Sequence, residues 1–376
     1  MSERIEAFLR EKSPPTPFLV VDLKIVRARY TELRQALPNA EIFYAVKANP
    51  ASEVVAALAQ LGANFDLASP GEITICRELA IEPGRLSFGN TVKRESAIAE
   101  AARDGIRLFA FDSDAELRKL ACRAPRARVF CRLLIENAGA EWPLSRKFGC
   151  DAHLAADLLV AAKGLGLHPS GVSFHVGSQQ TEPQAWAHAI GHAAWVFHAC
   201  RRRGIELELL NLGGGLPAHY RAPVPPLADY AEAIETALKT HFGGSGPRVL
   251  IEPGRYLVGD AGLLRTEILL ISRKSANEQE RWIYLDAGIY NGLAETLDER
   301  IHYPIRTARD GGPCGPVILA GPTCDSADIL YRRHPYELPL DLEIGEPVDF
   351  LSAGAYTASA AAVAFNGFAP IRSYYV

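Results

Sequence analysis

The sequence of 376 residues lacks the features that mark secreted, membrane and nucleic-acid-binding proteins. Its seven cysteines are scattered without a Cys-x-x-Cys spacing, so we expect neither a disulfide framework nor a metal site. No apolar run approaches the roughly 20 residues that cross a bilayer, and the charged opening is unlike a secretion signal. The net charge is only −4, which favours no nucleic-acid partner. We therefore expect a cytoplasmic globular protein, large enough for two cores.

Two common cofactor and metal signatures are also missing. No Gly-x-Gly-x-x-Gly follows a predicted strand, so dinucleotide binding has no support. His188 and His192 lie four residues apart on a predicted helix, but the glutamate of the metalloprotease pattern is absent. The chemistry of this chain must therefore depend on other residues.

A regular alternation of strand-like and helix-like segments fills the first two thirds of the chain. Eight apolar runs of strand length are separated, in most cases, by Ala/Leu-rich segments with helical spacing. The runs are 41–47, 64–69, 86–90, 108–113, 127–135, 171–178, 207–212 and 248–253. Strands that alternate with helices pair in parallel, and eight such units close a (β/α)8 barrel, here over residues 23–260.

A β-rich region follows over residues 261–376. Strand-like runs at 263–272, 281–285, 316–320 and 347–352 are separated by Gly, Pro and Asn turns, with no long helical pattern between them. We predict an α/β protein with a C-terminal β-sandwich or β-barrel domain, which the N-terminal segment 1–22 joins.

Polar residues gather at the carboxyl ends of the predicted barrel strands, where such barrels carry their active sites. They are Lys47, Asp66, Glu72, Arg132, His175, Ser178, Gly213, Gly214, Gly215, Glu252, Gly254 and Arg255. Taken singly, His175 could be an interior histidine, Glu252 could pair with Arg255, and the glycines could form only a tight turn. Lys47 could be a surface residue where its strand ends.

Taken together, these residues meet the needs of pyridoxal 5′-phosphate (PLP). A partly desolvated Lys47 can react with the aldehyde of PLP, and the three glycines with Arg255 can cradle the phosphate. The ring of His175 can stack on the pyridine, and Glu252 can keep the pyridine nitrogen protonated. We therefore predict a PLP site at the strand ends.

Seven motifs extend this interpretation along nearly the whole chain. They are Tyr44-Ala45-Val46-Lys47-Ala48-Asn49, Phe65-Asp66-Leu67-Ala68-Ser69, Ser173-Phe174-His175-Val176-Gly177-Ser178, Gly213-Gly214-Gly215-Leu216-Pro217, Glu252-Pro253-Gly254-Arg255-Tyr256, Gly321-Pro322-Thr323-Cys324-Asp325-Ser326-Ala327-Asp328 and Gly354-Ala355-Tyr356-Thr357. With them, the sequence resembles the fold-type III, alanine-racemase-like PLP decarboxylases of basic amino acids, and among these the bacterial ornithine decarboxylases. The resemblance implies conversion of L-ornithine to putrescine and CO2, a step of polyamine biosynthesis.

The resemblance also implies roles for the site residues. Lys47 would hold PLP covalently, His175 would stack on its ring, and Glu252 would bind the ring nitrogen. The phosphate would be held by Ser178, the backbone of Gly213, Gly214 and Gly215, Arg255 and Tyr356, with Gly254 beside them. Asp66, Glu72 and Arg132 would surround the lysine.

The Gly-Pro-Thr-Cys-Asp motif carries the remaining catalytic group in the family that this sequence resembles. Its cysteine, here Cys324, would return a proton to the α-carbon after CO2 leaves. Members of the family are homodimers in which the partner subunit supplies this motif, so a homodimer with shared active sites is expected.

The substrate is expected to be a small basic amino acid. Asp325 would pair with its distal ammonium, Tyr290 would also contact the substrate, and a second acidic contact falls on Asp298 or Glu299. Ornithine and lysine differ by one methylene, which is worth only about 1–3 kcal/mol in a pocket. L-Lysine or another amino acid, a racemase with a tyrosine base, and a non-catalytic regulator like the antizyme inhibitors remain as alternatives.

Overall fold

The computed structural model describes residues 2–135, 139–142, 147–244 and 246–376. The chain forms two compact units. The barrel unit comprises Arg27–Pro217 and Val224–Tyr256, and the β unit comprises the remaining stretches up to Val26, Ala218–Pro223 and Leu257–Val376. A short segment of the β unit is thus inserted in the sequence of the barrel unit.

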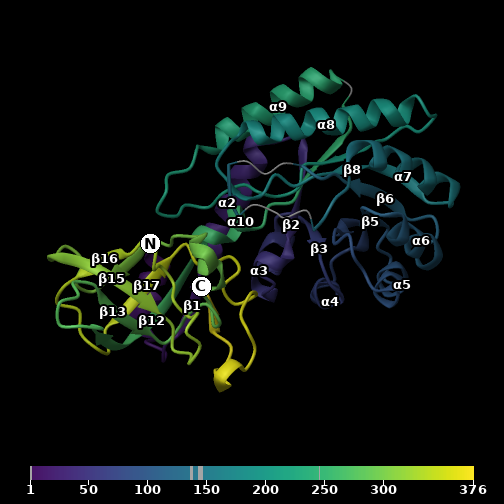
Figure 1. Ribbon diagram of the computed structural model, residues 1–376. Helices are drawn as coiled ribbons and strands as arrows, with labels where there is room; N and C mark the ends of the chain where they lie inside the picture. The colour runs from purple at the N-terminus through teal and green to yellow at the C-terminus, as the bar shows by residue number, and fades with distance from the viewer. Residues whose placement is uncertain (1, 136–138, 143–146, 245) are drawn as a thin grey trace. The chain divides into compact units, whose positions relative to one another are not determined.

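Eight parallel strands close a barrel in the order β10-β11-β2-β3-β4-β5-β6-β8, which confirms the predicted fold (Figure 1). The strands are β2 (Ala40–Ala45), β3 (Asn64–Leu67), β4 (Leu86–Phe88), β5 (Leu108–Phe111), β6 (Arg128–Arg132), β8 (His168–Ser173), β10 (Leu209–Asn211) and β11 (Arg248–Ile251). Each falls within or overlaps one of the eight predicted runs. Two further strands, β7 (Ala140–Trp142) and β9 (Ser178–Gln180), form a separate pair.

Helices connect the barrel strands, as their sequence spacing predicts. They are α2 (Leu23–Ala36), α3 (Ser52–Gln60), α4 (Pro70–Glu78), α5 (Glu95–Arg103), α6 (Asp114–Arg123), α7 (Ala152–Gly164), α8 (Gln184–Arg201) and α9 (Leu227–Phe242). Side-chain oxygens of Ser69, Ser113 and Asp151 accept hydrogen bonds from the first turns of α4, α6 and α7, which defines where these helices begin. Helices α8 and α9 pack through Trp186 and Tyr230, whose ring centroids are 5.5 Å apart.

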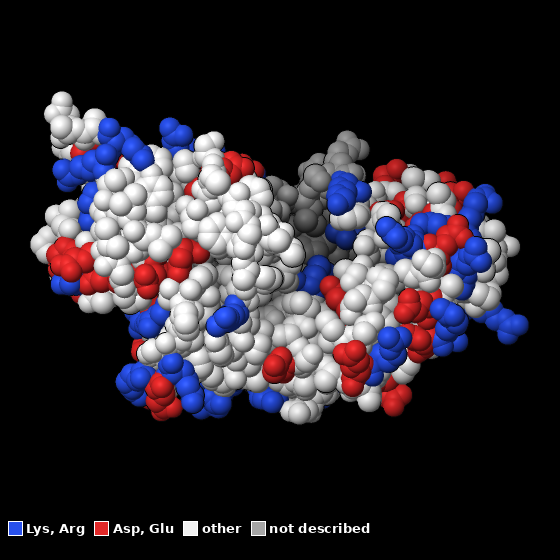
Figure 2. Space-filling view, turned by 90° about the horizontal axis from the view of Figure 1, so that it is seen from below, with Lys and Arg blue, Asp and Glu red and all other residues white. Residues whose placement is uncertain are grey.

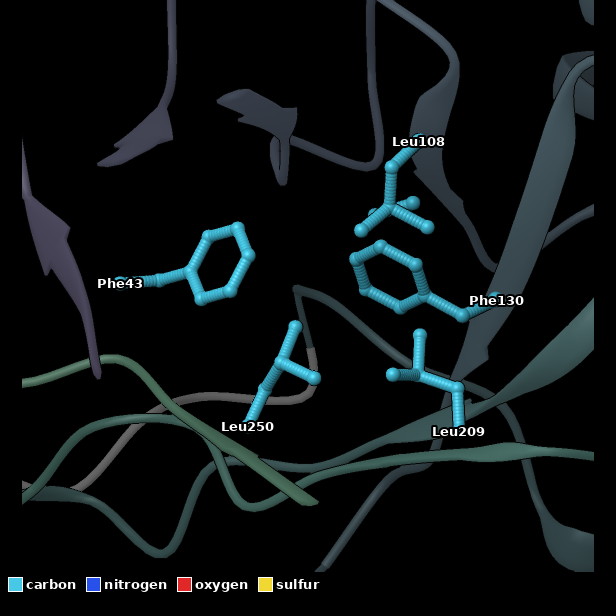
Figure 3. Close-up of a cluster of buried hydrophobic side chains, with 6 residues drawn as sticks. Phe43, Leu108, Phe130, Leu209 and Leu250 are labelled. Carbon is cyan, nitrogen blue, oxygen red and sulfur yellow. The ribbon is translucent and has the colours of Figure 1, made fainter. Parts of the chain in front are cut away.

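Apolar side chains fill the interior of the barrel. Figure 3 shows Phe43, Leu108, Phe130, Leu209 and Leu250 pointing toward one another from five different strands. Ala110 completes this cluster, and all of its members are buried. Because the interior is packed, polar chemistry can be placed only at an end of the barrel.

The β unit is built on an eight-stranded sheet. Its main path is β14 (Ile305–Thr307), β17 (Pro347–Leu351), β12 (Gly262–Ser272), β13 (Arg281–Leu285), β15 (Cys314–Ala320) and β16 (Tyr336–Pro339). The N-terminal strand β1 (Phe18–Val21) pairs with β12 and with the C-terminal strand β18 (Arg372–Tyr375). Helix α1 (Glu3–Glu11) packs Ile5 and Leu9 against Phe18, so both ends of the chain belong to this unit.

Acidic and basic side chains are intermixed on the face of the molecule shown in Figure 2. This distribution agrees with the nearly balanced total of 40 basic and 44 acidic residues. Within the described ranges, none of the helices has the length and apolar character needed to cross a bilayer.

Candidate active site

Lys47 and Asp66 form an ion pair at the carboxyl ends of neighbouring strands. Lys47 lies in the 3-10 turn Val46–Ala48 directly after β2, and its Nζ is 3.2 Å from Oδ2 of Asp66. The Asp66 side chain is buried, whereas that of Lys47 is 46% exposed. Oδ1 of Asp66 is also buried and has no hydrogen-bond partner among the described residues. A lysine held in this way is accessible to a ligand and remains next to a fixed negative charge.

Space for the Asp66 carboxylate depends on a glycine of the next strand connection. A Cβ atom at Gly89 would lie 1.9 Å from Oδ1 of Asp66, so any side chain there would displace the carboxylate. Nearby, Oε2 of Glu72 accepts a hydrogen bond of 2.7 Å from the backbone N–H of Ala68. Burial raises the pKa of Glu72 to about 6, which allows this carboxyl to be neutral in weakly acidic solution.

Glu252 follows β11 and is held by Asn211 at the end of β10. Nδ2 of Asn211 donates a hydrogen bond of 2.5 Å to Oε1 of Glu252. Burial, and the negative charge of Asp66, raise the pKa of Glu252 to about 7. Arg132 at the end of β6 and Lys47 oppose this shift because their charges favour the carboxylate. Glu252 is therefore a group that can hold or share a proton near neutral pH.

His175 follows β8 and is neutral at physiological pH. Burial lowers its pKa well below the usual value, and the charges of Arg132 and Lys47 act in the same direction. Nδ1 of His175 accepts a hydrogen bond of 3.0 Å from the backbone N–H of Gly177, which places the proton of the neutral ring on Nε2. A neutral, fixed imidazole is suited to stacking on an aromatic ligand.

The three glycines after β10 approach the neighbouring backbone too closely for side chains. A Cβ atom would lie 2.0 Å from the Phe174 carbonyl oxygen at Gly213, and 2.6 Å from the Gly177 carbonyl oxygen at Gly215. At Gly214 it would be 2.7 Å from the Glu252 carbonyl oxygen and 3.2 Å from Nε2 of His175. The missing side chains thus let the backbone after β10 lie against the backbone after β8 and β11, and the N–H of Gly213 donates a hydrogen bond of 2.9 Å to Oδ1 of Asn211.

Arg255 supplies positive charge beside this backbone. Its side chain is buried, and its Nε and Nη2 lie 3.3 Å and 3.1 Å from Oγ of Ser178 in β9. An arginine and a serine hydroxyl held together beside a glycine-rich turn are suited to a phosphate. Gly254, directly before Arg255, is buried, while Tyr356 belongs to the β unit and has a left-handed backbone with φ of 57°.

Tyr290, Cys324 and Asp325 come together within the β unit. The hydroxyl of Tyr290 donates a hydrogen bond of 2.8 Å to Oδ2 of Asp325, and the backbone N–H of Ala327 donates one of 2.9 Å to Oδ1. These two hydrogen bonds, that of Ala327 first, lower the pKa of Asp325. Asp325 is therefore an ionised carboxylate, and both Cys324 and Asp325 are accessible.

Asp298 and Glu299, the other acidic residues expected near the substrate, differ in their exposure and contacts. The Glu299 carboxylate accepts hydrogen bonds from the backbone N–H groups of Arg332, Arg333 and His334 and lies 2.8 Å from Nδ1 of His334. Its side chain is only 8% exposed, whereas Asp298 is an exposed residue. Glu299 thus anchors the segment 332–334, and Asp298 is the member of the pair that is accessible to a ligand.

Sequence reasoning missed three residues that shape these groups. Asn211 orients Glu252, Gly89 leaves room for Asp66, and Asn366 accepts a hydrogen bond from the backbone N–H of Cys324. Asn211 stands just before the glycines and Gly89 at the end of a predicted strand, so their positions were visible. No local signal connects Asn366 with Cys324.

The barrel residues fit the PLP cofactor that the sequence predicts. Lys47 is paired with Asp66 and accessible, and Oδ1 of Asp66 can accept a further hydrogen bond. Side chains at the three glycines would clash with neighbouring backbone. A neutral histidine and a titratable glutamate complete a set suited to an aromatic, nitrogen-containing ring that carries an aldehyde and a phosphate.

Comparison with known proteins agrees with this fit. Residues 23–259 match the family described as pyridoxal-dependent decarboxylase, pyridoxal binding domain. The lysine/ornithine decarboxylase of Selenomonas ruminantium is 38% identical over 95% of this chain and 88% of its own length. The solved lysine/ornithine decarboxylase of Vibrio vulnificus with putrescine has a TM-score of 0.87 and 31% identity, covering 100% of this chain and 99% of that one.

A further solved structure is similar to this chain and contains the cofactor. It is SrLDC in complex with PLP and cadaverine, with a TM-score of 0.88 and 35% identity over 99% of this chain and 93% of that chain. Both of these solved structures thus contain a diamine, and one of them contains PLP as well.

Proposed function

Since the chain belongs to the pyridoxal-dependent decarboxylases and is a PLP-dependent amino-acid decarboxylase, we propose that its substrate is L-ornithine, which it converts to putrescine and CO2. The observation that carries the proposal is Asp325, an accessible carboxylate kept ionised by Tyr290 and Ala327. Such a carboxylate is a partner for the distal ammonium of a diamino acid. The similar protein from Vibrio vulnificus was solved with putrescine, the product of this reaction.

The cofactor residues of the barrel unit have separate tasks in this proposal. Lys47 would hold PLP, and Asp66, whose Oδ2 lies 3.2 Å from Nζ of Lys47, would keep the lysine oriented. Glu252 keeps a proton at the pyridine nitrogen, and His175 covers the ring without adding charge. When bound, PLP supplies a protonated ring that takes up the electron pair left by departing CO2.

The groups of the β unit act on the substrate itself. Asp325 holds its distal ammonium, and the thiol of Cys324 donates a proton to the α-carbon after CO2 has left. The resulting thiolate regains its proton from water when the amine product leaves. An acid that is adjacent in sequence to the ammonium-binding carboxylate can be aimed at a substrate fixed at both ends.

We also propose that the protein works as a homodimer with shared active sites. Cys324 is exposed and Asp325 partly exposed in the single chain, and the nearby segment carries Val363 and Phe365, which are 81% and 38% exposed. A second subunit that covers these apolar groups would also seclude the thiol and the carboxylate from solvent. Sedimentation of the purified protein should therefore give twice the chain mass of 40.9 kDa.

The decisive experiment is a decarboxylation assay with a substrate panel. Purified protein with PLP is supplied with L-ornithine, L-lysine, L-arginine, meso-diaminopimelate and acidic amino acids, and CO2 and the amine are quantified. We expect the highest kcat/KM with L-ornithine and about 10-fold to 100-fold less with L-lysine. A preference for lysine would change the substrate but keep the reaction.

Cys324→Ala should slow amine formation and divert part of the turnover to an aldehyde, and an unaltered product distribution would remove Cys324 from its role.

A further inference from the structure

We propose that Asn366 is a positioning residue that aims the thiol of Cys324, from which the proton is transferred. The inference rests on the proposed function, in which Cys324 is the proton donor. Asn366 is not part of any motif that indicated the cofactor or the substrate. Its assignment comes from its contacts with Cys324 in the folded β unit.

One amide oxygen of Asn366 accepts two hydrogen bonds from the same cysteine. The backbone N–H of Cys324 donates at 2.9 Å and its Sγ at 3.4 Å, both to Oδ1 of Asn366. Two bonds to one atom fix the backbone and the Sγ of Cys324 relative to each other. An amide oxygen does not take up a proton near neutral pH, so it can hold the S–H bond in place without competing for its proton.

The turn that carries Asn366 explains how an exposed side chain can be held in place. Ala364, Asn366 and Gly367 have left-handed backbones, with φ of 59°, 50° and 79°. Asparagine tolerates this conformation better than most side chains, and glycine tolerates it best. Asparagine therefore gives this position a hydrogen-bond acceptor together with a backbone that can turn.

The same turn contacts Tyr290. The ring centroids of Phe365 and Tyr290 lie 4.6 Å apart, and the backbone N–H of Ala362 donates a hydrogen bond of 2.8 Å to the Tyr290 carbonyl oxygen. The hydroxyl of Tyr290 in turn holds Asp325. The segment 362–367 thus supports both the thiol and the neighbouring carboxylate, so the two groups keep a constant relation to a substrate bound by Asp325.

The chemical step needs only one proton. The Cys324 thiol gives its hydrogen to the substrate α-carbon, a C–H bond forms as the S–H bond breaks, and the thiolate is left to be protonated by water. If the thiol is poorly aimed, the proton is more often delivered to the cofactor. The turnover then ends in an aldehyde and pyridoxamine 5′-phosphate instead of an amine and PLP.

Two substitutions of Asn366 distinguish the effect of its hydrogen-bond acceptor from the effect of the backbone turn. Asn366→Gly removes the amide oxygen but keeps the left-handed backbone, whereas Asn366→Asp keeps an oxygen at the same place. Ala364→Gly relaxes the turn without touching the acceptor and serves as the matched control. All are compared as PLP-loaded proteins, with Cys324→Ala measured alongside them.

The first readout is independent of catalysis. Hydrogen exchange of the Cys324 backbone amide, followed by mass spectrometry, should be about threefold to tenfold faster in Asn366→Gly, the effect of one lost hydrogen bond. Asn366→Asp and Ala364→Gly should exchange like the unaltered protein. The second readout is the ratio of aldehyde to amine, which should rise about threefold to tenfold in Asn366→Gly and stay low in Ala364→Gly.

The outcomes distinguish failure of this inference from failure of the proposed function. If Cys324→Ala raises the aldehyde ratio but Asn366→Gly does not, Cys324 is the donor and Asn366 does not position it. If Cys324→Ala leaves the ratio unchanged, the proposed proton donor is wrong and the role of Asn366 falls with it. Equal exchange rates in Asn366→Gly and the unaltered protein would also overturn the inference.

Discussion

In the barrel unit the candidate cofactor residues are tuned by burial, whereas in the β unit the candidate substrate-binding carboxylate is tuned by hydrogen bonds. In the barrel unit, burial raises the pKa of Glu252 to about 7 and lowers that of His175. In the β unit, Asp325 is accessible, and its pKa is lowered by hydrogen bonds from Ala327 and Tyr290. The barrel therefore tunes protonation by desolvation, and the β unit fixes a charge by hydrogen bonding.

This difference matches two kinds of task. A cofactor ring needs a glutamate that can share a proton and a histidine without charge, and both follow from low polarity. A substrate that enters from water with a second ammonium needs an accessible carboxylate that stays ionised. Substitutions should therefore have large effects in the barrel unit and smaller, substrate-dependent effects in the β unit.

Replacement of Lys47 tests the strongest expectation for the barrel unit. Lys47→Ala should abolish the visible absorbance band of bound PLP and reduce turnover on the order of 10⁴-fold, because the covalent attachment is lost. Lys163, whose Nζ donates to the Gly204 carbonyl oxygen on the surface, provides the control as Lys163→Ala. An unchanged absorbance band in Lys47→Ala would remove Lys47 from its role.

A buried ion pair outside the cofactor site tests whether burial itself sets the size of an effect. Nζ of Lys93 lies 3.0 Å from Oε1 of Glu116, with side-chain exposures of 0% and 4%, and burial lowers the pKa of Lys93 to about 8. Lys93→Met should destabilise the protein by about 3–5 kcal/mol, because Glu116 keeps only Lys119 as its partner.

The control for Lys93 is an exposed pair on α6, the helix that carries Glu116. Arg118 and Asp114 are 2.7 Å apart with side chains 67% and 53% exposed, and Arg118→Met should leave the urea unfolding midpoint unchanged. The double substitution Lys93→Met with Glu116→Met should recover most of the stability lost in Lys93→Met. Equal midpoints for Lys93→Met and Arg118→Met would contradict the comparison between buried and exposed charges.

Glu252 should make the cofactor-free protein less stable as pH rises. Between pH 4.5 and about 7 the folded protein retains a proton on Glu252 that the unfolded chain has released. Stability from this group is therefore greatest below pH 4.5 and decreases by about 3 kcal/mol as pH rises through 7.

Glu252→Gln isolates this contribution, because Glu72 and His175 titrate in both proteins. The stability of Glu252→Gln relative to the unaltered protein should rise between pH 5 and pH 8, as measured by thermal unfolding without PLP. A constant difference over that range would show that Glu252 is not perturbed by burial.

The sequence predicted the barrel unit more completely than the β unit for a physical reason. Lys47, His175 and Glu252 each lie at the end of a predicted strand, and parallel strands of one barrel bring their ends to one rim. Their positions in the sequence were therefore enough to predict that they share a site. The hydrogen bonds of Asn366 with Cys324 join residues that are 42 positions apart and depend on a left-handed turn. The pairing of Tyr290 with Asp325 spans 35 positions and was likewise not visible as a contact. No periodic pattern connects such residues.

The smallest expected effect concerns Asp298 and Glu299, between which the sequence could not choose. Asp298→Asn should raise KM for ornithine about 10-fold with little change in kcat, because an accessible charge that attracts the distal ammonium is lost. Burial alone would raise the pKa of Glu299, but hydrogen bonds from Arg333 and His334 outweigh it and lower the pKa, as expected of an anchor. Glu299→Gln should therefore lower the thermal midpoint and leave KM unchanged.

Steady-state kinetics and thermal unfolding of both variants separate the two roles. Asp298→Asn should weaken ornithine and lysine alike but leave a monoamino acid without a distal ammonium unaffected, which distinguishes charge recognition from general damage. The reverse pattern, in which Glu299→Gln raises KM and Asp298→Asn does not, would mean that the Glu299 carboxylate leaves the backbone N–H groups of 332–334 when substrate binds. Glu299 would then alternate between anchoring that segment and binding substrate, and the contrast with the buried cofactor residues of the barrel unit would be sharper still.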